Sequence, residues 1–153
     1  MMAQYSFEPY LKEVHSNWYS DDALLKQLID HYAPEASRGT EDELNSWGNE
    51  VSGHLRELAE CSAKPENAPS LKHFDAYNNR IDEVVLPAST QEALKIVSGR
   101  EGLGAVHGNP YVFYSKGYLY AQNGEAGVGC SMACTDGLVR VLEALGDHPE
   151  HRR

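Results

Sequence analysis

Apolar residues recur every three or four positions over much of the chain, which is the spacing of one face of an α-helix. The first such run predicts a helix after Ser20, which is placed to be its N-cap, with Asp21 and Asp22 in a first turn that favours acidic side chains. Pro34 is expected to end this helix. Residues 1–19 lack this period and are expected to form an irregular N-terminal segment. The apolar positions of the run are Leu24, Leu25, Leu28, Ile29 and Tyr32.

A second amphipathic run predicts a longer helix from Thr40 to about Glu60. Thr40 and Glu43 match the capping-box pattern, in which each side chain bonds a backbone N–H group at the start of the helix. Gly48 and Gly53 lie inside the run, where glycine disfavours a helix by about 1 kcal/mol relative to alanine. The apolar positions are Leu44, Trp47, Val51, Leu55 and Leu58.

A loop and then a hairpin are predicted in the middle of the chain. Residues 61–70 are rich in turn-forming residues and are expected to form the loop. Two apolar groups within residues 71–86 are separated by Asn78 and Asn79, and asparagine tolerates the left-handed geometry of tight turns. This pattern predicts one short β-hairpin, which Pro87 ends.

Two further helices are predicted before the last one. Ser89 and Glu92 form another capping-box pattern, which predicts a short helix that ends near Gly99. Pro110 suits the first turn of the next helix, which runs to about residue 120 and is rich in tyrosine. Residues of this tyrosine-rich helix are expected to belong to the core.

The last predicted helix, over residues 128–145, has apolar side chains on more than one side, and Gly146 is placed to cap its end. A helix of this kind is expected at the centre of a bundle. Thr135, Asp136 and Gly137 in its middle are poor helix formers. A close helix crossing explains the glycine, but the carboxylate of Asp136 needs water, a partner or a ligand. The fold class predicted from these elements is mainly α, an up-and-down helical bundle with one short β-hairpin or extended segment near 71–86.

The charge balance disfavours nucleic acid and anionic membranes as partners. The chain has 23 acidic residues against 13 Lys and Arg, a formal net charge of -10, whereas both partners select for clustered basic residues. No apolar run approaches the roughly 20 residues that a membrane helix needs. Three cysteines and the lack of a signal-peptide core near the N-terminus disfavour a secreted disulfide scaffold, so a cytoplasmic location is expected.

No self-sufficient catalytic or metal-ligating set is found in the sequence. Cys130 and Cys134 share a helix face, but a metal site needs three or four ligands, so packing is favoured over metal or thiol chemistry. Ser131 lacks the second glycine of a nucleophile elbow. The glycine-rich segments 99–104 and 124–129 do not follow a good strand, so turn geometry is favoured over dinucleotide binding.

Two stretches of this sequence resemble the N-terminal helical domain of acyl-CoA dehydrogenases, in the branch of the adaptive-response (alkylation-response) flavoproteins. One is GYLYAQNGEAG over residues 117–127 followed by CSMACTDG over residues 130–137. The other is RIDEVV over residues 80–85 with Pro87, which resembles a short extended segment of that branch. The resemblance covers most of residues 70–150, whereas only the helix layout agrees over residues 1–69. It assigns residues 20–153 to an acyl-CoA dehydrogenase-like N-terminal helical domain.

The resemblance implies a role for the last helix in an acyl pocket. In that family the domain supplies one wall of the pocket, which implies an acyl-CoA-type ligand, and the positions expected to face it are Met132, Ala133, Asp136 and Gly137. The family also implies FAD, bound between a middle β domain and a C-terminal helical bundle, and a catalytic carboxylate from that bundle. No residue of this chain matches that carboxylate, so no catalytic residue is assigned.

The resemblance stops near Arg153, where the β domain of the family should begin. We therefore expect a fragment or split subunit that neither binds FAD nor completes α,β-dehydrogenation of an acyl thioester alone, and that works in a homo-oligomer or with a partner chain carrying the flavin domain. Two alternatives stay open at this point: a non-catalytic helical interaction or oligomerisation module, and a thiol or metal protein that uses Cys130 and Cys134.

Overall fold

The computed structural model of this chain describes residues 6–99, 102–104, 109–125 and 127–146, without the side chains of residues 36–38. It is mainly helical, with a single two-stranded antiparallel sheet among the described residues. The α-helices are α1 (Glu8–Val14), α2 (Ala23–Tyr32), α3 (Pro34–Glu50), α4 (Arg56–Ser62), α5 (Ala88–Ser98), α6 (Pro110–Ala121) and α7 (Gly127–Leu145). A π-helical turn, η1 (Val51–Leu55), a 3-10 turn, η2 (Pro65–Asn67), and the strands β1 (Ser70–Phe74) and β2 (Arg80–Val85) complete it. The predicted bundle with a short hairpin is therefore confirmed.

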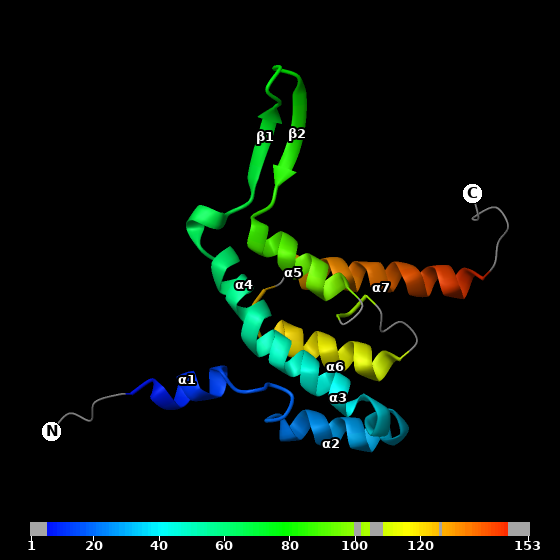
Figure 1. Cartoon of the computed structure of the whole chain (residues 1–153). Helices are drawn as coiled ribbons and strands as arrows, with labels where there is room; N and C mark the ends of the chain where they lie inside the picture. The colour runs from blue at the N-terminus through cyan, green and yellow to red at the C-terminus, as the bar shows by residue number, and fades with distance from the viewer. Residues whose placement is uncertain (1–5, 100–101, 105–108, 126, 147–153) are drawn as a thin grey trace.

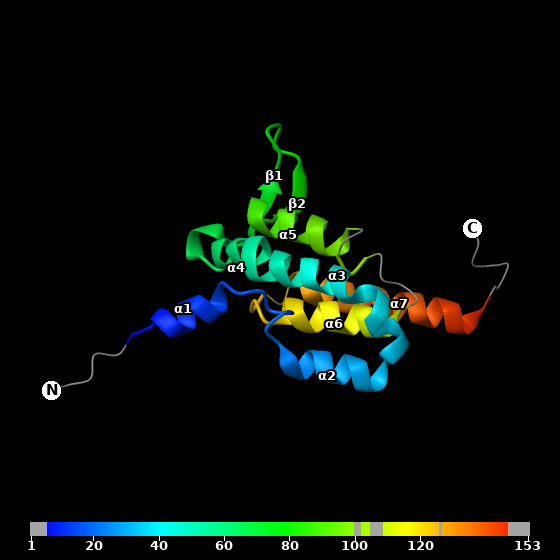
Figure 2. The same ribbon diagram turned by 60° about the horizontal axis from the view of Figure 1, so that its bottom comes forward.

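The helices pack side by side around one core, and the hairpin projects from them (Figure 1). The run α3–η1–α4 forms one long rod, with α6 alongside α3 and α5 against α4. In the turned view, α2 lies along the edge of α6 and α3, and α7 lies behind α6 (Figure 2). Helix α7 contacts both α5 and α6. The core consists mainly of Leu25, Ile29, Leu44, Trp47, Val51, Leu55, Ala93, Val97, Val112, Leu119, Tyr120, Val128 and Met132.

The first predicted helix begins later than its sequence pattern indicates, whereas its end before Pro34 agrees with the prediction. Asn17 accepts hydrogen bonds from the backbone N–H groups of Tyr19 and Ser20, at 2.9 and 3.0 Å, and holds this segment in a turn. The helix therefore starts later, with Asp22 rather than Ser20 as the N-cap that accepts from Leu25 N at 2.7 Å. It ends at Tyr32, just before Pro34, as predicted, and Pro34 also opens α3, where a missing N–H group has no cost.

The second predicted helix is longer than expected, because Thr40 lies inside α3 and not at its start. The glycines did not interrupt it, although η1 replaces the α-helical turn over Val51–Leu55. The capping box at Ser89 is also wrong, since α5 begins at Ala88 directly after Pro87. In contrast, the start of α6 at Pro110 agrees with the prediction, and so does the end of α7, where Gly146 has a φ of 69°.

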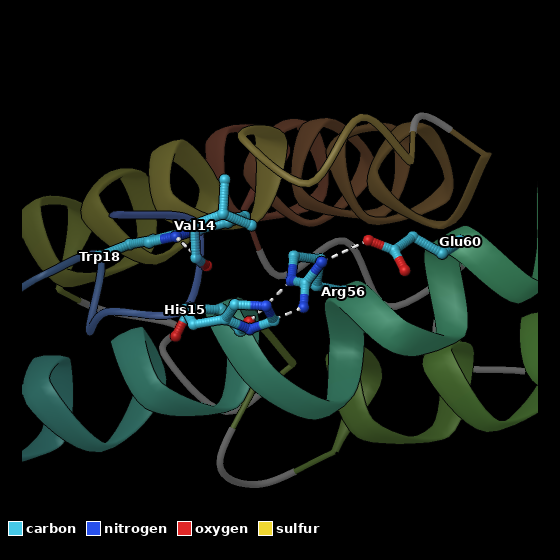
Figure 3. A network of polar contacts seen from close by, with 6 residues as sticks. Val14, His15, Trp18, Arg56 and Glu60 are labelled. Atoms are coloured by element: carbon cyan, nitrogen blue, oxygen red, sulfur yellow. Dashed lines mark hydrogen bonds and ion pairs between the residues drawn. The ribbon is translucent and has the colours of Figure 1, made fainter. Parts of the chain in front are cut away.

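The N-terminal segment is not irregular throughout, because residues Glu8–Val14 form α1. This helix has only seven residues, none of which is buried, and it has no side-chain cap. Its sequence therefore carries neither a long apolar pattern nor a capping signal. It is connected to the body by polar contacts at the junction of η1 and α4 (Figure 3). Arg56 donates to the Ser52 carbonyl at 3.0 Å, forms an ion pair with Glu60, and its Nη2 lies 3.1 Å from Nδ1 of His15. The ring of Trp18 donates back to the Val14 carbonyl at 3.2 Å.

A buried lysine connects three segments at the centre of the core. Lys116 on α6 is 0% exposed, and its Nζ lies 2.5 Å from Oε1 of Glu43 on α3. The same Nζ donates to the Gly102 carbonyl at 3.4 Å and lies 5.5 Å from the ring centroid of Trp47. Trp47 Nε1 in turn donates to the Lys116 carbonyl at 3.0 Å. Because an unpaired buried ammonium is strongly unfavourable, these contacts fix α3, α6 and the 102–104 segment in one arrangement.

Gly48 is required where the N-terminal turn crosses α3. A Cβ atom at this position would overlap Oδ1 of Asn17 and would lie 2.7 Å from Cβ and 2.8 Å from N of Tyr19. By contrast, a Cβ atom at Gly53, in the same helical run, would meet nothing within 4 Å. Of the two glycines within this helical run, only Gly48 is therefore required by a close approach, that of Asn17 and Tyr19 to α3.

Gly48→Ala is expected to lower the free energy of unfolding by about 1–3 kcal/mol, because the added methyl group displaces the Asn17 turn. The matched variant Gly53→Ala should leave stability unchanged or raise it by up to about 1 kcal/mol through helix propensity. Urea unfolding followed by circular dichroism measures both. Equal effects of the two substitutions would contradict the close approach at Gly48.

Candidate ligand groove between α6 and α7

An apolar groove of about 550 Å³ lies between α6 and α7. Aromatic side chains of α6 form one side, and small and apolar residues of α7 form the other. Concave apolar sites of this size between packed helices are typical of small-molecule binding. Its lining comprises Leu103, Phe113, Tyr114, Gly117, Tyr118, Tyr120, Ala121, Gly124, Glu125, Gly129, Met132 and Ala133.

The groove depends on how α7 begins. The Glu125 carboxylate accepts hydrogen bonds from Gly127 N at 2.8 Å and Val128 N at 2.9 Å, and so caps the helix. Its Oε2 also accepts from the Tyr120 hydroxyl at 2.7 Å, which joins the end of α6 to the start of α7. Gly129 lies beside the Tyr120 ring, where a Cβ atom would be 3.4 Å from the ring, in ordinary van der Waals contact.

Burial and the neighbouring carboxylate raise the pKa of Tyr120. Burial of the phenol is the largest cause, followed by the hydrogen bond to Glu125 and its negative charge. Both effects disfavour the phenolate, so Tyr120 stays protonated and remains a hydrogen-bond donor to Glu125 well above the pH at which an exposed tyrosine ionises.

A smaller hollow of about 190 Å³ continues the groove along α7. It shares Leu103, Phe113 and Met132 with the groove and adds Asp136, whose side chain is only 16% exposed. Asp136 Oδ2 accepts from Arg140 Nε at 2.7 Å, and the Arg140 guanidinium lies 5.9 Å from the centroid of the Tyr114 ring. The carboxylate that is out of place in an apolar helix is therefore paired within its own helix.

The structure brings together three of the four residues expected at the pocket. Met132 and Ala133 line the groove, and Asp136 lines the adjoining hollow. Gly137 lines neither, and a Cβ atom there would meet nothing within 4 Å, so no close helix crossing within the described residues explains it. Sequence reasoning missed the contribution of α6, because Tyr114, Gly117 and Tyr118 belong to a helix whose tyrosines were expected in the core.

One face of the outer half of α7 is largely uncovered by the described residues. Leu138, Val141 and Leu145 are each more than half exposed, and only Val128 and Met132 of the helix are buried. The expected position of this helix at the centre of the bundle is therefore wrong for this chain, because α5 and α6 cover one side only. The apolar residues on its opposite side are the reason why the pattern indicated a central helix.

The two glycine-rich segments of the described chain do not fit the pyrophosphate of FAD. Phosphates bind at helix N-termini where backbone N–H groups are free, but at α7 the Glu125 carboxylate already occupies Gly127 N and Val128 N. In the other glycine-rich segment, the spaces beside Gly102 and Gly104 are filled by the backbone carbonyl oxygens of Val97 and Ser98. Oxygen atoms that repel phosphate thus line both segments, and their glycines serve helix capping and packing.

The thiols stand apart from other candidate ligands. Cys130 and Cys134 are both exposed on α7, and no group of three or more His, Cys, Asp or Glu side chains that could hold a metal ion occurs in the described part of the chain. The structure thus adds no observation in favour of a metal or thiol site.

A second cavity, of about 580 Å³, lies where α1 and the following turn face α4 and the residues after α6. Charged and polar side chains make up most of its lining, and those of Arg56 and Glu60 already bind each other. We therefore take the groove between α6 and α7, whose lining is mainly apolar and accessible, as the candidate ligand site. Among the described residues, none of the helices combines the length and the apolar character needed to cross a bilayer.

Comparison with known proteins places this helical domain in a family. Residues 11–151 match the model of the adaptive response protein AidB N-terminal domain. The chain belongs to this family of acyl-CoA dehydrogenase-like N-terminal domains. The match begins within the segment 1–19 that the sequence pattern set apart from the domain.

A curated relative is acyl-CoA dehydrogenase family member 11 of Caenorhabditis elegans, which is 27% identical over 144 residues. The aligned region covers 89% of this chain but only 23% of that protein. The chain thus spans about a quarter of the length of the relative it matches. No solved structure matches the chain.

The raised pKa of Tyr120 predicts a loss of stability in alkaline solution. An unfolded tyrosine ionises near pH 10 and the folded one only at higher pH, so the unfolded state releases its proton first. The contribution of Tyr120 is complete below about pH 10 and is lost above it, by up to about 1.4 kcal/mol per pH unit.

Urea unfolding between about pH 9 and pH 11 should therefore show a shallower decline for Tyr120→Phe than for the native chain. Tyr111→Phe, at an exposed position, serves as the matched control and should follow the native chain. A Tyr120→Phe variant as sensitive to alkali as the control would show that Tyr120 is not the group responsible.

Proposed function

We propose that this chain forms one wall of the acyl pocket of a flavin-dependent, acyl-CoA dehydrogenase-like protein. The observation that carries the proposal is the apolar groove between α6 and α7, in a chain that belongs to a family of acyl-CoA dehydrogenase-like domains. The acyl chain lies along Met132 and Ala133 and is faced by Tyr114 and Tyr118. Asp136 marks the end of the wall at the adjoining hollow.

In this proposal the chain binds the acyl group and excludes water from it, but carries out no redox step. Asp136 is not offered as a catalytic base, because Arg140 holds it as a paired carboxylate. Since neither glycine-rich segment fits the pyrophosphate of FAD, the flavin and the base are assigned to other parts of a protein of the relative's length. The outer face of α7, with Gly137, Leu138, Val141 and Leu145, is assigned to contact with those parts, because exposed apolar patches mark association sites.

The proposal predicts that acyl-CoA affinity rises with chain length. Each buried methylene group contributes about 0.8 kcal/mol, which is about fourfold in Kd, until the groove is filled. Titration of the chain with octanoyl-CoA, with the ε-methyl signal of Met132 observed by NMR, should shift that signal, whereas free CoA should not.

Two substitutions of α7 distinguish the groove from general hydrophobic binding. Ala133→Leu fills the groove and should weaken octanoyl-CoA binding by about tenfold or more, the equivalent of about two lost methylene contacts. Ala144→Leu adds the same side chain at an exposed position of the same helix outside the groove and should have no effect. Binding that is independent of acyl length, or equally reduced by both substitutions, contradicts the proposal.

A further inference from the structure

The groove between α6 and α7 leads to a carboxylate. Its own lining is mainly apolar, whereas the adjoining hollow of about 190 Å³ includes Thr135 and Asp136 in its lining. The side chain of Asp136 is only 16% exposed. Water in the hollow solvates this carboxylate, so a ligand that enters the hollow must replace the hydrogen bonds of the water that it displaces.

Asp136 keeps hydrogen-bonding capacity that its own helix does not use. The two oxygens of a carboxylate accept about four hydrogen bonds in all. Arg140 Nε donates to Oδ2 at 2.7 Å, and among the described residues Asp136 has no other donor. The neighbouring hydroxyl of Thr135 donates to the Ser131 carbonyl at 2.9 Å instead. Oδ1 of Asp136 is therefore available to a donor that reaches the hollow.

The hollow lies within reach of an acyl chain laid along α7. The groove includes Gly129, and Asp136 follows seven residues later, which is about 10 Å along a helix that rises 1.5 Å per residue. An extended chain advances about 1.2 Å per covalent bond, as the extended polypeptide backbone does, so about ten carbons span this distance.

The size of the hollow decides which end of the ligand enters it. At about 30 Å³ for each water-sized group, a hollow of about 190 Å³ holds about six such groups. This is enough for the end of an acyl chain and too little for coenzyme A. The thioester and the coenzyme therefore extend from the wider groove, and the far end of the acyl chain meets Asp136.

The charges at the hollow select the chemistry of that far end. A methyl group would displace water from the carboxylate without replacing its hydrogen bonds. A carboxylate would place a second negative charge beside Asp136. An ammonium group would lose its hydration although Arg140 already balances the charge of Asp136. A hydroxyl group carries no charge and supplies a donor, so it matches the acceptor that is available.

We propose that this groove selects acyl chains of about ten carbons whose far end carries an uncharged hydrogen-bond donor, such as a hydroxyl group, which donates to Asp136. The inference rests on the proposed acyl pocket and adds to it a preference for the end of the chain. Met132 and Ala133 contact the apolar part of the chain, and Arg140 holds the carboxylate in place.

Calorimetric titration with two matched thioesters tests this preference. Undecanoyl-CoA and ω-hydroxydecanoyl-CoA have acyl chains of equal size that differ only in a terminal methyl or hydroxyl group. The native chain should bind ω-hydroxydecanoyl-CoA more tightly by about tenfold or more in Kd, because a hydrogen bond to a charged acceptor replaces the lost water.

A substitution at Asp136 should reverse that preference. Asp136→Leu replaces the carboxylate with an apolar group of similar size, so undecanoyl-CoA should become the tighter ligand by about fourfold, the equivalent of one buried methyl group. Glu143→Leu makes the same kind of change at an exposed position of α7 outside the groove and the hollow and should keep the native preference. Circular dichroism confirms that both variants are folded.

The outcomes separate this inference from the acyl pocket on which it rests. If octanoyl-CoA binds but the two matched thioesters bind equally, or if Asp136→Leu keeps the native preference, this inference is overturned and the pocket stands. Tightest binding of a decanedioyl-CoA monothioester would show that Arg140 contacts the end of the chain, which also overturns it. A chain that binds no octanoyl-CoA overturns both proposals.

Discussion

The buried ammonium group of Lys116 is the constraint on which the arrangement of this domain depends. It joins the Glu43 carboxylate and the Trp47 ring of α3 to the carbonyl of Gly102. Such a charge is tolerated in a core only when its partners are in place, so it selects one packing of α6 on α3 where apolar contacts alone would permit several. The neighbouring Leu103 is thereby held against α6, where it becomes part of the groove.

The second constraint acts at the other end of α6. Glu125 caps α7 and accepts a hydrogen bond from the Tyr120 hydroxyl, while Gly129 of α7 lies beside the same ring. Together these contacts hold the first half of α7 close to α6, and the groove lies along this contact. Beyond Asp136, the apolar side chains of Leu138, Val141, Leu142 and Leu145 are exposed. The ligand groove and the uncovered outer face are thus two sides of one helix.

The sequence pattern predicted most elements, and its errors have specific physical causes. The hairpin, the start of α6 and the cap at Gly146 were recognisable because each depends on local backbone geometry. Ser20 is not a cap because Asn17 holds its backbone N–H group in a turn before the helix. Thr40 is not a cap because Pro34 already begins α3 six residues earlier. Helix α1 was missed because it buries nothing.

By itself, the sequence determined the helical class of the domain, the hairpin, the family resemblance and the importance of the last helix. Periodicity and caps are local properties, so they can be read from neighbouring residues. Only the tertiary structure decided that Met132 and Ala133 share a groove with Tyr114 and Gly117, that Asp136 is paired by Arg140, and that Gly137 looks outward. It also decided that Lys116 lies in the core. These facts depend on which faces of distant helices meet, and the spacing of residues along one helix does not contain that information.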